Sequence, residues 1–536
     1  MMLPEDMRLW VGRDHFVWFL IEVIGGLDTT ALEARCRPGK GRPGYDPRML
    51  AVLLIYAYCQ AERSSRRIEE RCRTDAAFRV ATGNLVPDHS TICRFRAAAA
   101  CQGGPLEDLF TRVLFVLAAA GLGRLDVISV DGSKIWADAS KQANRTEAGL
   151  RKLARAILDE AARADGEDCA CAGHQHGEAA GLDGPGSCGC CDGGMLPGLG
   201  LDGPAVPRGG WGGAPRAQRI AAGLAGLQAA RLEAEAQRRA AAETYLAAAR
   251  AGTAPRGGIP ADVAVQVAEL RLEQALAKDA ATDARWAEAG RRLPGRRRPG
   301  AESARTRKAR GQLAAAVQAR KDKTAADAAQ DGNKKEPQPV RNITDPDSRI
   351  MHCTLRGLVQ AYNCQAPRTA DGVFLLPRAT QDVNDARQVE PAIADITRSQ
   401  QVIAAGHAAG HHPSFRSAIG TVLFDPGYFS KNNIELPGPG RLIGTGGSWT
   451  DTTPQHGPGC DHHDPRDQMA HNLATRQGRD LYRRRAPLSE GAFAYLKDII
   501  GLRRFAMRGL PKAHGELLLA CTAANIHLLF RRTRPA

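Results

Sequence analysis

The sequence Leu-Asp-Val-Ile-Ser-Val-Asp at residues 125–131 is a short apolar run, rich in β-branched residues, that ends in a carboxylate. Such a run is typical of a buried strand. A second run of this kind, Thr-Val-Leu-Phe-Asp, occupies residues 421–425. If the two strands are neighbours in one sheet, Asp131 and Asp425 meet at the same edge and repel each other unless a cation neutralises them. Carboxylate oxygens are hard ligands that suit Mg²⁺ or Mn²⁺, so the pair is a candidate metal site.

A third acidic residue is wanted for such a site, and Glu490 is the best candidate because it opens a predicted helix. Lys497 falls seven residues later, on the same helical face. The arginine-rich residues 482–485 precede this helix, so one segment can hold a metal and a phosphate together. Taken singly, an Asp at a strand end is usually a turn former and a Glu on a helix is usually solvated. The joint arrangement of the residues therefore carries the hypothesis.

The first 120 residues are predicted to be helical, with apolar positions between Leu50 and Tyr58 on one face of a helix. A second helix starts near residues 64–65 and has a mostly basic surface, and a further short helix carries Arg94 and Arg96. This pattern fits a helix-turn-helix DNA-binding unit. It fits an ordinary helical domain with a solvated basic face equally well.

Composition indicates what kind of partner the chain has. The 536 residues carry a formal net charge of +15, which favours a polyanion, most simply nucleic acid. The longest apolar runs, such as residues 49–59, are shorter than the ~20 residues of a membrane-spanning helix. The N-terminus is acidic and has no charged-then-apolar leader, and the 14 cysteines are scattered, as in a reducing cytosol. We therefore expect a cytoplasmic protein with no membrane partner.

The middle of the chain is poor in core material. Residues 147–340 contain only three of the 27 aromatic side chains and are rich in Ala, Arg and Gly, so we interpret them as an insertion, partly helical and partly disordered. Strands are predicted at 350–364, 372–377 and 441–443, and helices at 384–404, 489–500 and 516–530. The predicted organisation is a helical N-terminal DNA-binding domain, two parts of an α/β catalytic domain and the insertion between them, at residues 1–120, 121–146, 341–536 and 147–340 respectively.

Four segments resemble DDE-type insertion-sequence transposases, which have an RNase H-like catalytic core. They are Pro87–Arg96, Val130–Ser133, Leu423–Phe429 and the set Tyr482, Arg485, Glu490 and Lys497. The resemblance covers roughly residues 40–145 and 340–530. It implies an α/β RNase H-like fold, a mixed sheet flanked by helices, with an all-α N-terminal domain and a large low-complexity insertion.

The resemblance also implies a reaction. Two Mg²⁺ (or Mn²⁺) ions would be held by Asp131, Asp425 and Glu490, which are both catalytic and metal-ligating residues. One site would hydrolyse DNA at the element ends and then join the freed 3′-hydroxyls to target DNA by phosphoryl transfer.

The partner implied is double-stranded DNA, both element ends and target, bound by a homodimer or a larger assembly because an element has two ends. The side chains expected to contact DNA are Tyr482, Arg485, Lys497, Arg94 and Arg96. Two other functions stay open: a metal-dependent nuclease that cleaves without joining, and a helix-turn-helix regulator whose acidic residues are structural.

Two further features allow two interpretations each. Cysteines and histidines between Cys169 and Cys191 include zinc-ligand types, but their spacing matches no known finger, so we favour free thiols over a structural Zn²⁺. Trp136 lies just past Asp131. It can stack on a base or pack within the fold, and we favour packing.

Overall fold

The computed structural model describes residues 6–34, 44–100, 103–171, 214–253, 259–290, 300–330, 338–353, 357–412, 418–446 and 464–533. The chain divides into two compact units. The first, here called the core unit, combines residues 1–223 with 341–536, and the second, the helical unit, comprises residues 224–340. The core unit thus rejoins two distant parts of the sequence.

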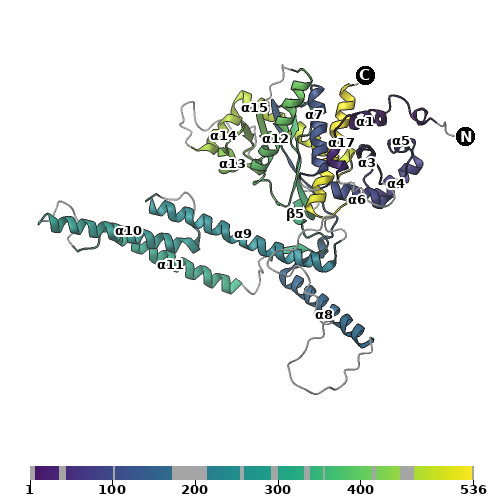
Figure 1. Cartoon of the computed structure of the whole chain (residues 1–536). Helices are drawn as coiled ribbons and strands as arrows, with labels where there is room; N and C mark the ends of the chain where they lie inside the picture. Colours follow the sequence, from purple (N-terminus) through teal and green to yellow (C-terminus); the bar gives the residue numbers. More distant parts are fainter. Residues whose placement is uncertain are drawn as a thin grey trace. The chain divides into compact units, whose positions relative to one another are not determined.

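The N-terminal part of the core unit is helical, as predicted (Figure 1). Its elements are η1 (Met7–Leu9), α1 (Phe16–Gly25), α2 (Thr30–Glu33), α3 (Pro47–Cys59), α4 (Ser65–Thr74), α5 (Ala76–Ala81), α6 (His89–Ala99) and α7 (Pro105–Ala119). Aspartates cap four of them; for example, Asp46 accepts from the N–H of Arg48, and Asp88 accepts from the N–H groups of Ser90 and Thr91. Helix α3 is buried along almost its whole length, so it forms a central element of the core.

Two sheets meet at Asp131. The first has the strand order β10-β9-β1-β7, made by Arg441–Ile443, Thr421–Phe424, Val127–Ser129 and Arg368–Thr369. Strands β10, β9 and β1 are parallel, and β7 is antiparallel to β1. The chain leaves β1 and starts β2 (Gly132–Trp136) directly after Asp131.

Strand β2 belongs to an antiparallel sheet in which β6 (Gly357–Gln365) pairs with β2, β5 (Arg349–Cys353) and β8 (Arg378–Thr380). A small third sheet pairs β3 (Asn144–Thr146) with β4 (Val340–Asn342) and joins the two ends of the insertion. The strand predicted at 372–377 does not form. Only a single bridge, between Arg368 and Phe374, occurs there, although Phe374 is buried.

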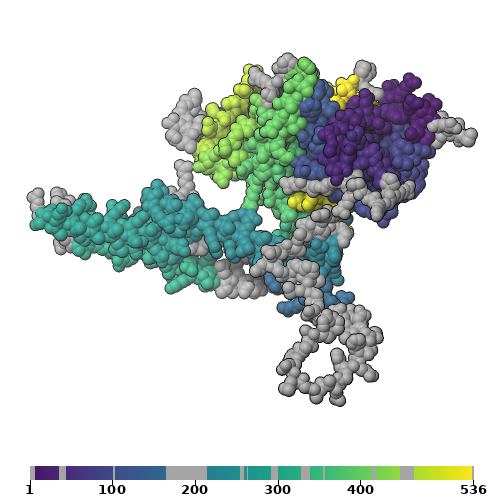
Figure 2. Space-filling view, in the orientation of Figure 1, coloured from purple at the N-terminus to yellow at the C-terminus, as the bar shows by residue number. Residues whose placement is uncertain are grey.

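The core unit contains further helices among its described residues. They are α8 (Glu147–Cys171), α12 (Val389–Ala409), α13 (Lys431–Glu435), α14 (Pro465–Ala474), α15 (Arg476–Arg483), α16 (Arg485–Ala494) and α17 (Leu510–Thr533). Short turns of 3₁₀-helix occur as η2 (Lys141–Ala143) and η4 (Pro426–Tyr428), and a π-helical turn, η5 (Tyr495–Ile499), continues α16. In the space-filling view, α12, in green, lies between the purple and blue N-terminal helices and the yellow-green α14–α15 (Figure 2).

Helix α17 joins the N-terminal helices to the rest of the core unit. It packs against α3 and α7, and one hydrophobic cluster includes residues of all three helices and of both sheets. Buried Glu516 accepts from the N–H groups of Ala506 and Met507, and Arg63 donates to the carbonyls of Gly501 and Arg504. Residue 120 is therefore not a boundary between compact units.

The insertion contains long helices. Helix α9 (Arg216–Arg250) runs from the core unit into the helical unit, which also contains α10 (Ala261–Glu288) and α11 (Ala304–Gln330). Helices α10 and α11 pack against each other, and the carboxylate of Asp279 accepts from the N–H of Ser303 and the hydroxyl of Thr306. The side chains of the Cys169–Cys191 cluster lie outside the described residues. None of the described helices has the length and apolar character needed to cross a bilayer.

Close packing of α12 on α7 depends on Gly406. A Cβ built there lies 2.6 Å from the carbonyl oxygen of Phe115. We predict that Gly406→Ala lowers the free energy of unfolding by about 1–3 kcal/mol, although Ala is the better helix former. Urea denaturation measures this. Gly25→Ala in α1 is the control, because a Cβ there meets no atom within 4 Å, and a loss as large at Gly25 would contradict the explanation.

Candidate active site

The two acidic strand ends lie side by side. Strands β1 and β9 are parallel with Ser129 opposite Leu423, and the N–H of Val130 donates to the carbonyl of Leu423 at 2.9 Å. Asp131 and Asp425 each follow two residues after that registered pair. The prediction that the strands are neighbours in one sheet is thus confirmed, and it places the carboxylates at one edge.

Burial makes this pair of carboxylates costly to ionise. It raises the pKa of Asp131 to about 6, and the nearby charge of Asp425 contributes. Burial also raises the pKa of Asp425, with a further contribution from the charge of Asp385. The positive charge of Arg485 opposes both shifts. A divalent cation would relieve the same repulsion, and oxygen donors of this type fit Mg²⁺ or Mn²⁺.

Helix α16 is fastened alongside Asp131. The hydroxyl of Ser489 lies 2.5 Å from that of Ser129, two residues before Asp131. The ammonium of Lys497 donates to the hydroxyl of Ser133, two residues after Asp131, at 2.5 Å. These two contacts lie on either side of Asp131 in the chain. They hold α16 and the turn after it next to Asp131.

Glu490 follows Ser489 on this helix, and its side chain is exposed to solvent. Among the described residues, no group of three or more His, Cys, Asp or Glu side chains is gathered closely enough to hold a metal ion. The structure therefore brings Asp131 and Asp425 together and brings the backbone of α16 beside them, while the Glu490 carboxylate stays outside the pair.

The helix that carries Lys497 is not regular. Residues Tyr495–Ile499 form a π-helical turn, in which the N–H of Ile500 donates to the carbonyl of Tyr495 at 3.0 Å. Such turns insert one extra residue and are frequent at functional sites. Lys497 is half-buried, which lowers the pKa of its ammonium. The sequence predicted one continuous helix here, so this irregularity was missed.

Tyr482 needs a correction. We expected its side chain to contact DNA, but it is only 8% exposed, and its hydroxyl donates to the carbonyl of Phe424 at 3.0 Å. A Cβ on residue 444 would overlap that hydroxyl, so glycine is needed at this position. Tyr482 therefore fastens α15 to the end of β9, next to Asp425.

Arg485 points inward. Its guanidinium carbon lies 5.7 Å from the centre of the Tyr482 ring, and its charge acts on both Asp131 and Asp425. Its Nε is buried and has no hydrogen-bond acceptor among the described residues. The arginine thus lies close enough to the two carboxylates for its charge to act on both.

Arg96 needs a correction too. It was expected to bind DNA, but it is 2% exposed and donates to the carbonyl of Arg63 at 2.8 Å and to the hydroxyls of Tyr58 and Ser65. It holds α6 against α3 and α4. Arg94, on the opposite face of the same helix, is exposed.

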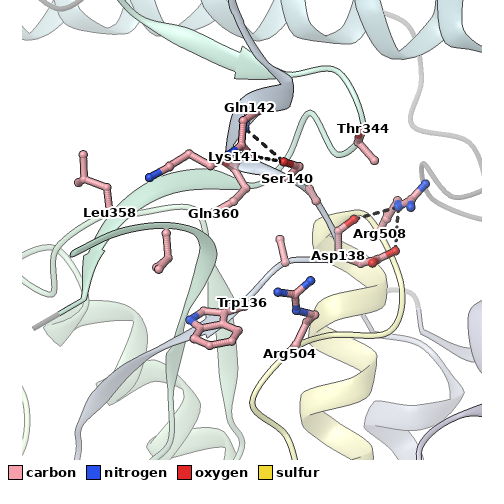
Figure 3. A pocket seen from close by; sticks show the side chains of 13 residues that line it. Trp136, Asp138, Ser140, Lys141, Gln142, Thr344, Leu358, Gln360, Arg504 and Arg508 are labelled. Atoms are coloured by element: carbon pink, nitrogen blue, oxygen red, sulfur yellow. Dashed lines mark hydrogen bonds and ion pairs between the residues drawn. The ribbon is translucent and has the colours of Figure 1, made fainter. Parts of the chain in front are cut away.

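An open groove lies further along β2 (Figure 3). Its volume is about 660 Å³, and its lining includes Trp136, Lys141, Arg504 and Arg508. The guanidinium carbon of Arg504 lies 5.5 Å from the centre of the Trp136 ring, and Arg508 pairs with Asp138 at 2.9 Å. Trp136 is partly exposed, so both interpretations of it, base stacking and packing, stay open.

The sequence also gave no sign of Asp385. It lies in the loop before α12, and no strand or motif marks it. Its charge acts on both Asp131 and Asp425. The signal that points to it is Gly132, directly after Asp131, where a Cβ would overlap the Asp385 carboxylate.

Comparison with protein-family models gives two matches. A transposase domain (DUF772) matches residues 5–98, and a transposase DDE domain matches residues 456–530. No curated protein and no solved structure matches the chain. Both models describe transposases, one at each end of the core unit. These two matches support a DDE-type insertion-sequence transposase.

This identification has two consequences. A DDE transposase domain implies an enzyme that acts on DNA, and this class generally uses divalent metal ions. The second match includes Tyr482, Arg485, Glu490 and Lys497. Asp131 and Asp425 lie outside both matched segments, so neither match bears on them.

The raised pKa of Asp131 predicts that replacing this residue increases the free energy of unfolding, and that the increase depends on pH. The folded protein holds this proton up to about pH 6, whereas the unfolded chain releases it near the ordinary aspartate pKa of 3.8. Ionised Asp131 therefore lowers stability as pH rises from 4 to 6, and the cost stays constant above that range. Asp131→Asn should raise the free energy of unfolding at pH 8 by on the order of 1 kcal/mol in EDTA, with little effect at pH 4. Denaturant unfolding at both pH values checks this, and equal effects at both would contradict it.

The two arginines of α6 should behave differently. Arg96→Ala removes buried hydrogen bonds and should lower the free energy of unfolding by about 2 kcal/mol. Arg94→Ala should change it by less than about 0.5 kcal/mol and should weaken DNA binding with a shallower salt dependence. Denaturation and DNA titrations at several salt concentrations measure these effects. Equal losses of stability would contradict the assignment.

Proposed function

We propose that this chain cleaves DNA at the ends of an insertion sequence and joins the freed 3′-hydroxyls to target DNA. The supporting observation is the register of β1 and β9, which sets Asp131 beside Asp425 at two parallel strand ends. Glu490 is proposed as the third acidic residue, since α16 is held along Asp131 by Ser489.

An RNase H-like arrangement is the proposed fold of the catalytic domain. Strand β1, parallel to β9 in one sheet, continues through Asp131 into β2 of the antiparallel sheet, and helices pack beside the sheets. We keep the proposal that the first 120 residues bind DNA and that residues 147–340 are an insertion in the catalytic domain.

The proposed site residues have separate tasks. Asp131, Asp425 and Glu490 would hold Mg²⁺ or Mn²⁺ through their oxygens. A divalent ion supplies Lewis acidity, which lowers the pKa of a water or 3′-hydroxyl and stabilises the leaving oxygen. Arg485 and Lys497, already placed around Asp131, would bind the phosphate oxygens and orient the scissile bond.

The proposed partner is double-stranded DNA, as element end and as target, and the proposed location is the cytoplasm. A net charge of +15 favours this polyanion. Exposed arginines on α4 and α6 offer phosphate contacts on the N-terminal part; they are Arg66, Arg67, Arg71, Arg73 and Arg94. Two copies or more would assemble, because two element ends are cut and joined together.

Cleavage and joining of labelled end DNA with Mg²⁺ tests the proposal. Wild type should give both the nicked product and the joined product. Glu490→Gln should lower both rates at least about a hundredfold, because it removes an anionic oxygen ligand of the divalent ion. Glu435→Gln on α13 is the matched control, an exposed acidic residue that pairs with Lys431, and it should leave both rates unchanged.

The cleaved and the joined products test different parts of the proposal. Normal cleavage by Glu490→Gln would show that this residue is not the third acid. Cleavage by wild type without any joined product would indicate a nuclease instead of a transposase. If wild type, like Asp131→Asn, leaves the DNA uncut under all conditions, the proposed site is contradicted.

A further inference from the structure

Asp385 is a third aspartate at the edge where β1 and β9 end. Its side chain is only 17% exposed. One carboxylate oxygen, Oδ1, accepts from the amides of Asn363 and Gln365 on β6, each at 2.7 Å. The other oxygen, Oδ2, faces the ammonium of Lys134 on β2 at 3.5 Å. The aspartate thus joins the loop before α12 to two neighbouring strands.

The turn after Asp131 is shaped to this carboxylate. A Cβ on Gly132 would overlap Oδ1 of Asp385 and would lie 2.6 Å from Nε2 of Gln365. Gly132 pairs with Gln365 across β2 and β6. Asp385 therefore packs directly on the backbone that positions Asp131.

Lys134 has two possible acidic partners. It is 15% exposed, so its ammonium is largely withdrawn from water and gains from a carboxylate beside it. Its charge also acts on Asp425. In the structure the ion pair is made with Asp385, which leaves Asp425 with the N–H of Gly427 at 2.9 Å.

A direct metal-ligand role for Asp385 is less well supported than this indirect one. Oδ1 is already occupied by two amide hydrogen bonds, and Oδ2 faces an ammonium. Within the described residues, Asp385 also forms no group of three with Asp131 and Asp425 that could hold an ion.

We propose that Asp385 is a positioning residue: it holds Lys134 away from Asp425 and clamps the turn after Asp131 onto β6, so that Asp131 and Asp425 stay free to bind a divalent cation. This inference rests on the proposed metal-dependent function of the same site. Residues that orient metal ligands in this way commonly change metal affinity 10- to 100-fold when they are removed.

Titration of the full-length, EDTA-treated chain with Mn²⁺, without DNA, tests this. Free Mn²⁺ is followed by electron paramagnetic resonance. Asp385→Asn should weaken Mn²⁺ binding about tenfold, because the freed Lys134 turns to Asp425. Adding Lys134→Gln to that variant should restore most of the affinity, and Lys134→Gln alone should bind at least as tightly as wild type.

Asp395→Asn is the matched control. Asp395 is a buried carboxylate on α12 that pairs with Arg378 at 2.8 Å and shares no partner with Asp131 or Asp425. The Asp395→Asn substitution removes one negative charge, as Asp385→Asn does, and should leave Mn²⁺ binding unchanged. Thermal melts of every variant establish that each is folded.

The outcomes separate the inference from the proposed function. If wild type binds Mn²⁺ no better than Asp131→Asn, the proposed metal site is contradicted, and the positioning role of Asp385 is contradicted with it. If wild type binds but Asp385→Asn binds equally well, the inference alone is overturned. Loss as complete as in Asp131→Asn, or no restoration by Lys134→Gln, would also overturn the positioning role. Should Asp385→Asn not fold, weaker binding by Lys134→Gln alone would overturn it.

Discussion

The parallel pairing of β1 with β9 is the constraint on which the proposed site depends. It joins segments that are almost 300 residues apart and sets Asp131 and Asp425 at the same level, two residues beyond a shared register. Two carboxylates so placed and partly withdrawn from water repel each other. The fold keeps them in place because β1 and β9 are buried in the centre of a four-stranded sheet.

The surrounding elements supply positive charge and anchoring for this pair. Arg485 stands close to both carboxylates, Lys497 is fastened to Ser133, and Lys134 is paired with Asp385. Tyr482 and Ser489 fix α15 and α16 to the ends of β9 and β1. The repulsion between Asp131 and Asp425 lowers stability when no cation is bound. A bound cation relieves this repulsion, so the same pair favours cation binding.

Local patterns predicted the elements that local forces control. The strands before Asp131 and Asp425 are short, β-branched and apolar, and aspartates cap the helices that begin near residues 46 and 88. The predicted strand at 372–377 did not form because the side chains of Asn525 and Ser399 bind backbone groups of Phe374 and Leu376 there. Arg96, Tyr482 and Asp385 could not be placed from sequence, since no local pattern shows which polar side chain becomes buried. Their burial follows from contacts with segments distant in the chain.

Anomalous diffraction from crystals of the full-length protein soaked in Mn²⁺ shows whether the aspartate pair binds a divalent ion. We expect a manganese peak within coordination distance of the carboxylate oxygens of both Asp131 and Asp425, and its disappearance in Asp425→Asn crystals. A peak elsewhere in the core unit, or none between the two carboxylates at saturating Mn²⁺, would contradict it.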